Sequence, residues 1–218
     1  MMRRDLPIAG TSEPARGGDR SQDRGEVCGA HPISPACGGI EAGPCRRGVF
    51  VSMIDERRWL CSFGTGKVIS IKPHHFVDII TAFGDGCTRF EPHPYGHAVH
   101  RVAAEILADR DAMIRIEFGA DDICGPCRHN IDGLCDDTID TSFRPQAPKS
   151  KRQYNLLLDE RWAERLGLRP GDELTARRFC LLLRDRAGDI SDIYRENPAE
   201  RTAQRHTKLQ NGLAWFLA

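Results

Sequence analysis

The sequence predicts an α+β fold that is mainly helical, with two or three short strands and a cysteine-rich metal loop. Apolar residues recur at helical spacing in several segments of the chain. They alternate at strand spacing only in two short stretches, 67–71 and 113–119. Three cysteines, Cys124, Cys127 and Cys135, fall in a segment rich in turn residues. The first two observations predict the fold class, and the third predicts the loop.

The elements follow in chain order from their start and stop signals. KVISI (67–71) alternates like a strand, and Pro73 then opens a helix, because proline suits the first turn. Gly84 and Gly86 end that helix. MIRIEFG (113–119) reads as a half-buried strand that ends where the cysteine loop begins. Further helices are expected over residues 94–110, 159–168, 173–185 and 197–218, and residues 142–151 read as a linker.

Composition limits the class of protein. Of 218 residues, 28% are charged and 40% hydrophobic, which is ordinary for a globular chain, and the formal net charge is zero. The charge gives no reason to expect nucleic acid or an anionic membrane as a partner. No apolar run approaches the ~20 residues of a membrane span. The N-terminal arginines have no apolar segment behind them, so no secretory signal is predicted and the expected location is the cytoplasm.

The chain divides into two parts of different composition. Residues 1–52 are rich in Gly, Pro, Arg and Ser without helical or strand period, so a disordered extension is expected there. Residues 53–218 are expected to form a single metal-binding domain, and Met53 is an alternative start. The terminal segment can pack on this domain or on a second subunit, so the sequence leaves the oligomeric state open.

The cysteine loop, ADDICGPCRHNIDGLCDD (120–137), allows three interpretations. A C-x2-C turn offers two sulfurs to one metal centre, and the glycine-bearing return brings Cys135 to it. CGPC is also the tetrad of thioredoxin-like thiol-disulfide oxidoreductases, in which it opens a helix. A plain structural turn is the third reading. The flanking acids disfavour a free thiolate, whereas a bound cation deprotonates its thiol ligands, so we favour the metal interpretation.

A histidine pair supplies the second group of candidate site residues. His74 and His75 are adjacent on the first predicted helix and therefore point about 100° apart. His75 and Asp78 are three residues apart and share a face, which could offer an imidazole and a carboxylate to the metal. Cys87 is the alternative fourth ligand, whereas Cys180 lies in an apolar helix and is expected in the core.

Three segments together resemble a family of small cytosolic proteins catalogued as a domain of unknown function and often labelled iron–sulfur binding. They are PHHFVDIITAFGDG, IRIEFGADDICGPCRHNIDGLC and LLLDERWAERLGLRPGDELT, within residues 67–185. The family pattern has a cysteine where Asp78 stands here. The resemblance implies an iron–sulfur cluster on the three loop cysteines, with the fourth ligand changed.

The first hypothesis is therefore an iron–sulfur protein, with a [4Fe–4S] cluster on Cys124, Cys127 and Cys135. Asp78, a histidine or a small-molecule substrate would take the fourth position. If the protein is an enzyme, His74 or His75 is the expected proton carrier, because imidazole titrates near neutral pH. A redox partner is expected if the site transfers electrons. The alternatives are a zinc-binding structural module and, third, a CGPC thiol-disulfide oxidoreductase. Asp121 and Asp122 are expected to brace the loop.

Overall fold

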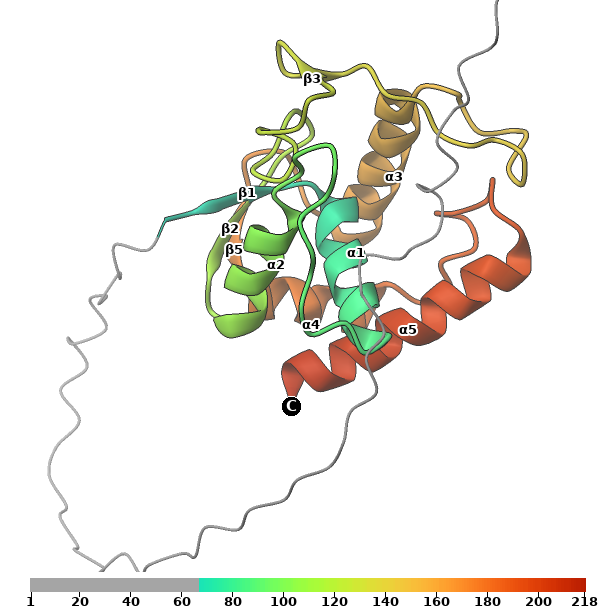
Figure 1. Cartoon of the computed structure of the whole chain (residues 1–218). Coiled ribbons are helices and arrows are strands. Elements are labelled where there is room, and N and C mark those ends of the chain that lie inside the picture. Colours follow the sequence, from blue (N-terminus) through green and yellow to red (C-terminus); the bar gives the residue numbers. More distant parts are fainter. Residues whose placement is uncertain (1–66) are drawn as a thin grey trace, which may run out of the picture.

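The computed structural model describes residues 67–218, and the expectations for residues 1–52 and Met53 lie outside this part. Within it, five helices and five short strands form an α+β fold that is mainly helical, as the sequence predicts. Helix α1 (Pro73–Gly84) lies at the centre, with the small sheet on one side and α5 (Ala199–Leu217) crossing it on another (Figure 1). No helix among these residues is long and apolar enough to cross a membrane.

The main sheet has three strands in the order β1-β2-β5. β1 (Ile69–Ile71) pairs in parallel with β2 (Met113–Ile116), and β5 (Glu173–Thr175) pairs antiparallel on the other side of β2. Helices α1 and α2 (Val99–Ala108) connect the two parallel strands, as parallel pairing requires a long crossover. The central strand places Ile114 and Ile116 in the core. β1 is followed almost directly by α1, whose first turn contains the histidine pair.

Helix α1 begins at Pro73, as predicted, and packs closely on α5. Gly84 and Gly212 lie at this contact: a Cβ on Gly212 would come within 2.0 Å of the Ile80 carbonyl oxygen. On another face of α1, the Phe76 ring stacks on Phe179 of α4 (Ala176–Arg186), with 4.2 Å between ring centroids. Because α1 is packed against α5 on one face and α4 on another, the two histidines at its first turn are held in a defined position.

Three predicted boundaries are wrong. Helix α3 (Lys151–Leu166) begins eight residues before the predicted start at 159, because the Ser150 hydroxyl caps it by accepting a hydrogen bond from the Gln153 N–H. Residues 173–175, predicted as helix, form β5 instead, and Thr175 then caps α4. Residues 94–98, predicted as helix, precede α2 without helical structure, since Pro94 lies in a turn and Gly96 has a positive φ. In each case a cap or a turn residue outweighs the apolar pattern.

The cysteine loop contains a hairpin that the sequence did not suggest. β3 (Asn130–Ile131) pairs antiparallel with β4 (Leu134–Cys135), joined by Asp132 and Gly133. Both turn residues have positive φ, 50° and 82°, the combination that a tight two-residue hairpin turn needs. The hairpin returns the chain so that Cys135 lies opposite Asn130.

Candidate metal centre

The three loop cysteines line one cavity of about 170 Å³. Cys124 and Cys127 come from the turns after β2, and Cys135 comes from the end of the hairpin. The turn is closed by the Cys127 N–H, which donates to the Cys124 carbonyl at 2.9 Å. The His129 N–H donates to the Cys127 sulfur at 3.3 Å, a contact that stabilises negative charge on a thiolate. The loop thus gathers its sulfurs around a single space.

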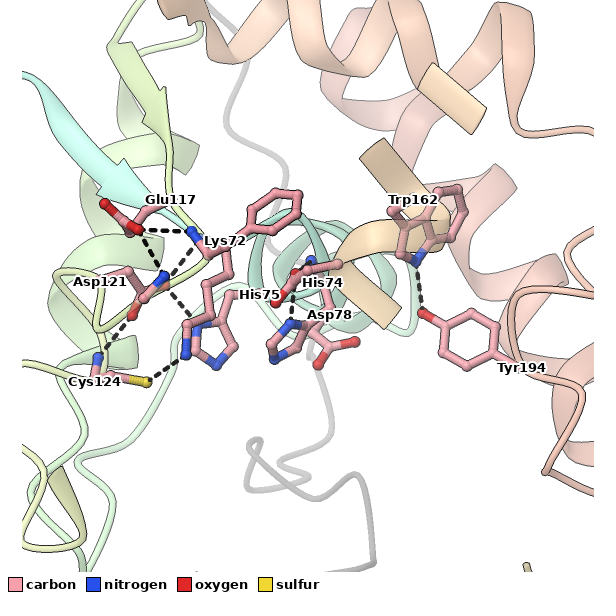
Figure 2. A network of polar contacts seen from close by, with 12 residues as sticks. Lys72, His74, His75, Asp78, Glu117, Asp121, Cys124, Trp162 and Tyr194 are labelled. Atoms are coloured by element: carbon pink, nitrogen blue, oxygen red, sulfur yellow. Dashed lines mark hydrogen bonds and ion pairs between the residues drawn. The ribbon is translucent and has the colours of Figure 1, made fainter. Parts of the chain in front are cut away.

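Asp121 braces this loop, as predicted. Its carboxylate accepts hydrogen bonds from the Cys124 N–H at 2.8 Å and from the Lys72 N–H at 2.9 Å. It also contacts His75 Nδ1 at 2.7 Å. Burial alone would raise the pKa of Asp121, but the His75 imidazole and these hydrogen bonds hold it well below its usual range. Figure 2 shows Lys72, His75, Asp121 and Cys124 side by side. Asp122 acts similarly, accepting from the Ser70 N–H at 3.2 Å.

Of the histidine pair, His75 is the one that lines the cysteine cavity. Because an ionised carboxylate only accepts hydrogen bonds, Nδ1 of His75 carries the proton and Nε2 is the nitrogen available to a ligand. Among residues 67–218, His75, Asp121 and Cys124 are the group whose potential ligand atoms lie within 4.8 Å of one another. A carboxylate that orients a histidine in this way is a common second partner of metal-bound imidazole.

His74 has a different environment from its neighbour. Its backbone N–H and its Nδ1 both contact Oδ1 of Asp159, at 2.9 and 2.8 Å. Asp159 is only 1% exposed, and its Oδ2 has no hydrogen-bond partner among the described residues. The two histidine rings lie 4.2 Å apart between centroids. Two imidazoles, each oriented by its own carboxylate, therefore stand side by side at the start of α1.

The electrostatics of Cys124 disfavour a free thiolate. Burial raises the pKa of the Cys124 thiol to about 12, and the Asp121 carboxylate adds to the rise. Lys72 opposes it, with Nζ 3.5 Å from the sulfur. A thiol-disulfide oxidoreductase needs the opposite shift, and residues 124–127 lie in turns rather than at the start of a helix. Both findings weigh against the CGPC redox interpretation.

Of the fourth ligands suggested by the sequence, Asp78 and Cys87 do not line the cysteine cavity, whereas a histidine, His75, does. Asp78 accepts a hydrogen bond from Arg205 Nη1 at 2.5 Å and borders a second, larger cavity. That ion pair holds the pKa of Asp78 below its usual range, despite the opposing effect of burial. Cys87 is buried in the hydrophobic core and is disulfide-bonded, so it has no thiolate to offer a metal. Cys180 is also buried in the core, as predicted.

Sequence reasoning missed several residues of the site. Lys72 and His97 line the cysteine cavity, and Lys151 joins them from α3. The position of Lys72, two residues before the histidine pair, could have indicated that it lies near the site. His97 and Lys151 come from segments far from the loop, so nothing in the linear pattern linked them to it. Burial lowers the pKa of His97 to about 4, and His93 and Lys151 repel its protonated form further. His97 is therefore neutral at pH 7.

Comparisons with protein-family models, with curated proteins and with solved structures give no match.

Proposed function

We propose that this protein holds an iron–sulfur cluster, [4Fe–4S], through Cys124, Cys127 and Cys135, with His75 facing the fourth iron. The observation that carries the proposal is that these four side chains line one cavity. Cys124, Cys127 and Cys135 are free thiols, the form that can bind a metal group once deprotonated, and the cytoplasm is the location we propose.

The size of the cavity favours a cluster over a single ion. One zinc ion holds four ligands at about 2.0–2.3 Å, which brings the donor atoms within roughly 4 Å of one another. Among the described residues, the group whose potential ligand atoms all lie within 4.8 Å of one another contains His75 and Cys124 but neither Cys127 nor Cys135. A cubane cluster presents its irons at separate corners, so its cysteine sulfurs stand further apart than the ligands of one ion. The cavity of about 170 Å³ also exceeds what one ion needs.

The surroundings fit the charge of such a group. Three thiolates on a cluster carry negative charge, which Lys72 Nζ at 3.5 Å from Cys124 and the His129 N–H at 3.3 Å from Cys127 offset. When bound, a cluster held by three thiolates supplies an iron that no cysteine occupies, which acts as a Lewis acid. His74, oriented by Asp159, is then the imidazole placed to move a proton to or from a molecule beside it.

A zinc-binding structural module is the second candidate. The observation in its favour is the Asp121–His75 contact at 2.7 Å, because carboxylate–histidine–zinc arrangements are common. In this case the three thiolates and His75 would close a tetrahedral site with no position for a substrate. The two candidates share ligands and differ in the metal and in the open coordination position.

Metal analysis of the full chain, purified without oxygen, separates the candidates. We expect about four irons and four acid-labile sulfides per chain, with visible absorption. Cys127→Ser should lose most of the iron, while Cys180→Ala, which removes a thiol outside the loop, should keep it. In the reduced protein, a nitrogen hyperfine coupling should vanish in His75→Ala and persist in His206→Ala, because His206 lies on α5 and does not line the cysteine cavity.

Two results would contradict the cluster. Stoichiometric zinc without iron would make the protein a zinc module. Full iron content in Cys127→Ser would show that the loop is not the site. Circular dichroism of each variant checks that the helices are intact, so that a loss of iron is not a loss of fold.

A further inference from the structure

Asp159 brings a buried carboxylate oxygen without a hydrogen-bond partner to the wall of the cysteine cavity. Asp159 lines this cavity and is only 1% exposed. Its Oδ1 contacts the backbone N–H and Nδ1 of His74, which lines the larger cavity of about 710 Å³ and not the cysteine cavity. Oδ2 has no partner among the described residues and is therefore the oxygen left for a ligand. An unpaired buried carboxylate oxygen costs free energy, which a bound hydrogen-bond donor would offset.

The charged side chains that line the cysteine cavity leave one further group unpaired. Lys72 contacts the Cys124 sulfur at 3.5 Å, and Lys151 forms an ion pair at 2.9 Å, so both lysines are engaged. Arg152 is exposed on α3, and its guanidinium has no hydrogen bond, ion pair or ring contact among residues 67–218. One guanidinium and one oxygen of Asp159 are thus available, a positive and a negative group in the wall of the same cavity.

These two groups lie on one face of α3. Arg152 and Asp159 are seven residues apart, which is two helical turns and about 10 Å along the axis. Asn155 lies between them and lines both cavities. A molecule with a positive end at Asp159 and a negative end at Arg152 would therefore lie along α3. The rest of it has room past Asn155 in the larger cavity, where Tyr154 and Leu158 provide a ring and an apolar side chain.

An ammonium group suits Asp159 better than a metal ion does. The described residues form no group of three close His, Cys, Asp or Glu ligands that includes Asp159. An ammonium needs only hydrogen-bond acceptors, and the cysteine cavity holds a second one. Asn130 donates from Nδ2 to the Gly125 carbonyl at 3.2 Å, while its Oδ1 is buried without a partner. For the opposite end, a carboxylate carries the single negative charge that one guanidinium balances, and it matches the guanidinium in shape.

We propose that the wall between Arg152 and Asp159 binds an α-amino acid with an apolar side chain. Its ammonium donates to Asp159 Oδ2 and Asn130 Oδ1, and its carboxylate pairs with Arg152. Its side chain extends past Asn155 into the larger cavity. This inference deepens the proposed function by naming a ligand class, and it rests on that function only for a reaction at the cluster. Binding itself requires no metal.

Calorimetric titration of the full chain with three matched probes tests this inference. L-Phenylalanine carries both charges, phenethylamine lacks the carboxylate, and 3-phenylpropionate lacks the ammonium. We expect phenylalanine to bind at one site per chain and each singly charged probe to bind about tenfold or more weakly, the effect of losing one charge-assisted hydrogen bond. Asp159→Asn should remove the advantage of phenylalanine over 3-phenylpropionate. Arg152→Gln should remove its advantage over phenethylamine.

Glu160→Gln and Arg184→Gln are the matched controls, because both residues are exposed and line neither cavity. Both variants should bind phenylalanine as the wild type does. Arg152 is exposed, so Arg152→Gln should fold even if Asp159→Asn does not, and circular dichroism checks each variant.

The inference fails if phenylalanine does not bind, or if the three probes bind equally, since the ring alone would then be recognised. It also fails if Arg152→Gln binds phenylalanine as tightly as the wild type does. Iron analysis of the same samples keeps the two proposals apart. Phenylalanine binding without iron overturns the cluster alone, whereas iron without binding overturns the amino-acid site alone. Loss of iron in a folded Asp159→Asn variant would make Oδ2 a metal ligand and would also overturn the amino-acid site.

Discussion

Asp121 and Asp159 are both buried carboxylates, yet they are stabilised to different degrees. Asp121 accepts two backbone N–H groups and contacts His75 Nδ1. Asp159 uses one oxygen for both contacts with His74, and its Oδ2 is buried without a partner among the described residues. An unsatisfied carboxylate oxygen costs free energy, so packing alone does not explain it. Asp159 lines the cysteine cavity, which makes a functional explanation the better one.

Glu196 and Arg161 form an ion pair away from the site and give a pH-dependent prediction. Arg161 donates to both carboxylate oxygens, at 2.7 and 2.8 Å, and the two side chains are 14% and 10% exposed. Hydrogen bonding from Arg161 holds the pKa of Glu196 below its usual value. The unfolded chain therefore binds the proton more readily than the folded one. The contribution of this ion pair to the free energy of unfolding is fully present above the ordinary Glu pKa. It is lost as the pH falls through the lowered pKa of Glu196 in the folded state.

We expect Glu196→Gln to lower the free energy of unfolding by about 1 kcal/mol at pH 7. The difference from wild type should shrink as the pH falls from 6 to 3. Urea denaturation at a series of pH values measures it. Glu160→Gln, an exposed change in the same helix as Arg161, is the control and should leave the pH profile unchanged. A pH-independent difference would show that the charge of Glu196 is not what matters.

The local pattern predicted helices well and ligand partners poorly. Pro73 marked the start of α1, and the spacing of the cysteines located the loop, because both signals lie within a few residues. The helix predicted over 159–168 begins instead at Lys151, so Asp159 lies inside α3. Its side chain is buried against His74, which lies 85 residues earlier in the chain. His97, Lys151 and Arg205 reach their places only through tertiary packing, so no spacing rule could connect them to the histidine pair.

The crossing of α1 and α5 gives a prediction at the level of elements. An exposed helical glycine replaced by alanine normally gains up to about 1 kcal/mol of stability. At Gly212 the sign should reverse, because a Cβ would approach the Ile80 carbonyl oxygen to 2.0 Å and force the helices apart. We expect Gly212→Ala to destabilise the fold by about 3 kcal/mol. Thermal and urea denaturation measure this.

Asn211→Ala is the matched control, one residue earlier on the exposed side of the same helix. It should be neutral or slightly stabilising. Similar stabilities for the two variants would mean that α1 and α5 do not pack through their glycines. Since α1 carries His74 and His75, Gly212→Ala should also reduce the iron content in proportion to the unfolded fraction.

Across the whole molecule, the candidate metal loop and the core differ in how they are held. Most of the largest buried side chains among the described residues, including Phe76, Trp162 and Phe216, belong to the helices, and none belongs to the hairpin. The hairpin has two-residue strands, and its Ile131 and Leu134 are 52% and 48% exposed. Hairpins of this size are marginal without further support. A metal group bound by the three cysteines would supply that support, because binding only the folded loop stabilises it.

Removal of the metal should therefore loosen the loop without unfolding the protein. In hydrogen exchange followed by mass spectrometry, we expect the amides of residues 124–135 to lose protection after chelation of anaerobically purified protein, while α1 and α5 keep theirs. The physical reason is that the core helices bury their apolar faces mainly against one another, and Ile123 is the only residue of the loop that belongs to the hydrophobic core. Cys180→Ala with metal bound should leave the loop protected.

Simultaneous loss of protection in α1, α5 and the loop would show instead that the metal holds the whole domain together. It would favour the zinc module, whose metal is required for folding, over a cluster placed at the edge of an independently stable fold.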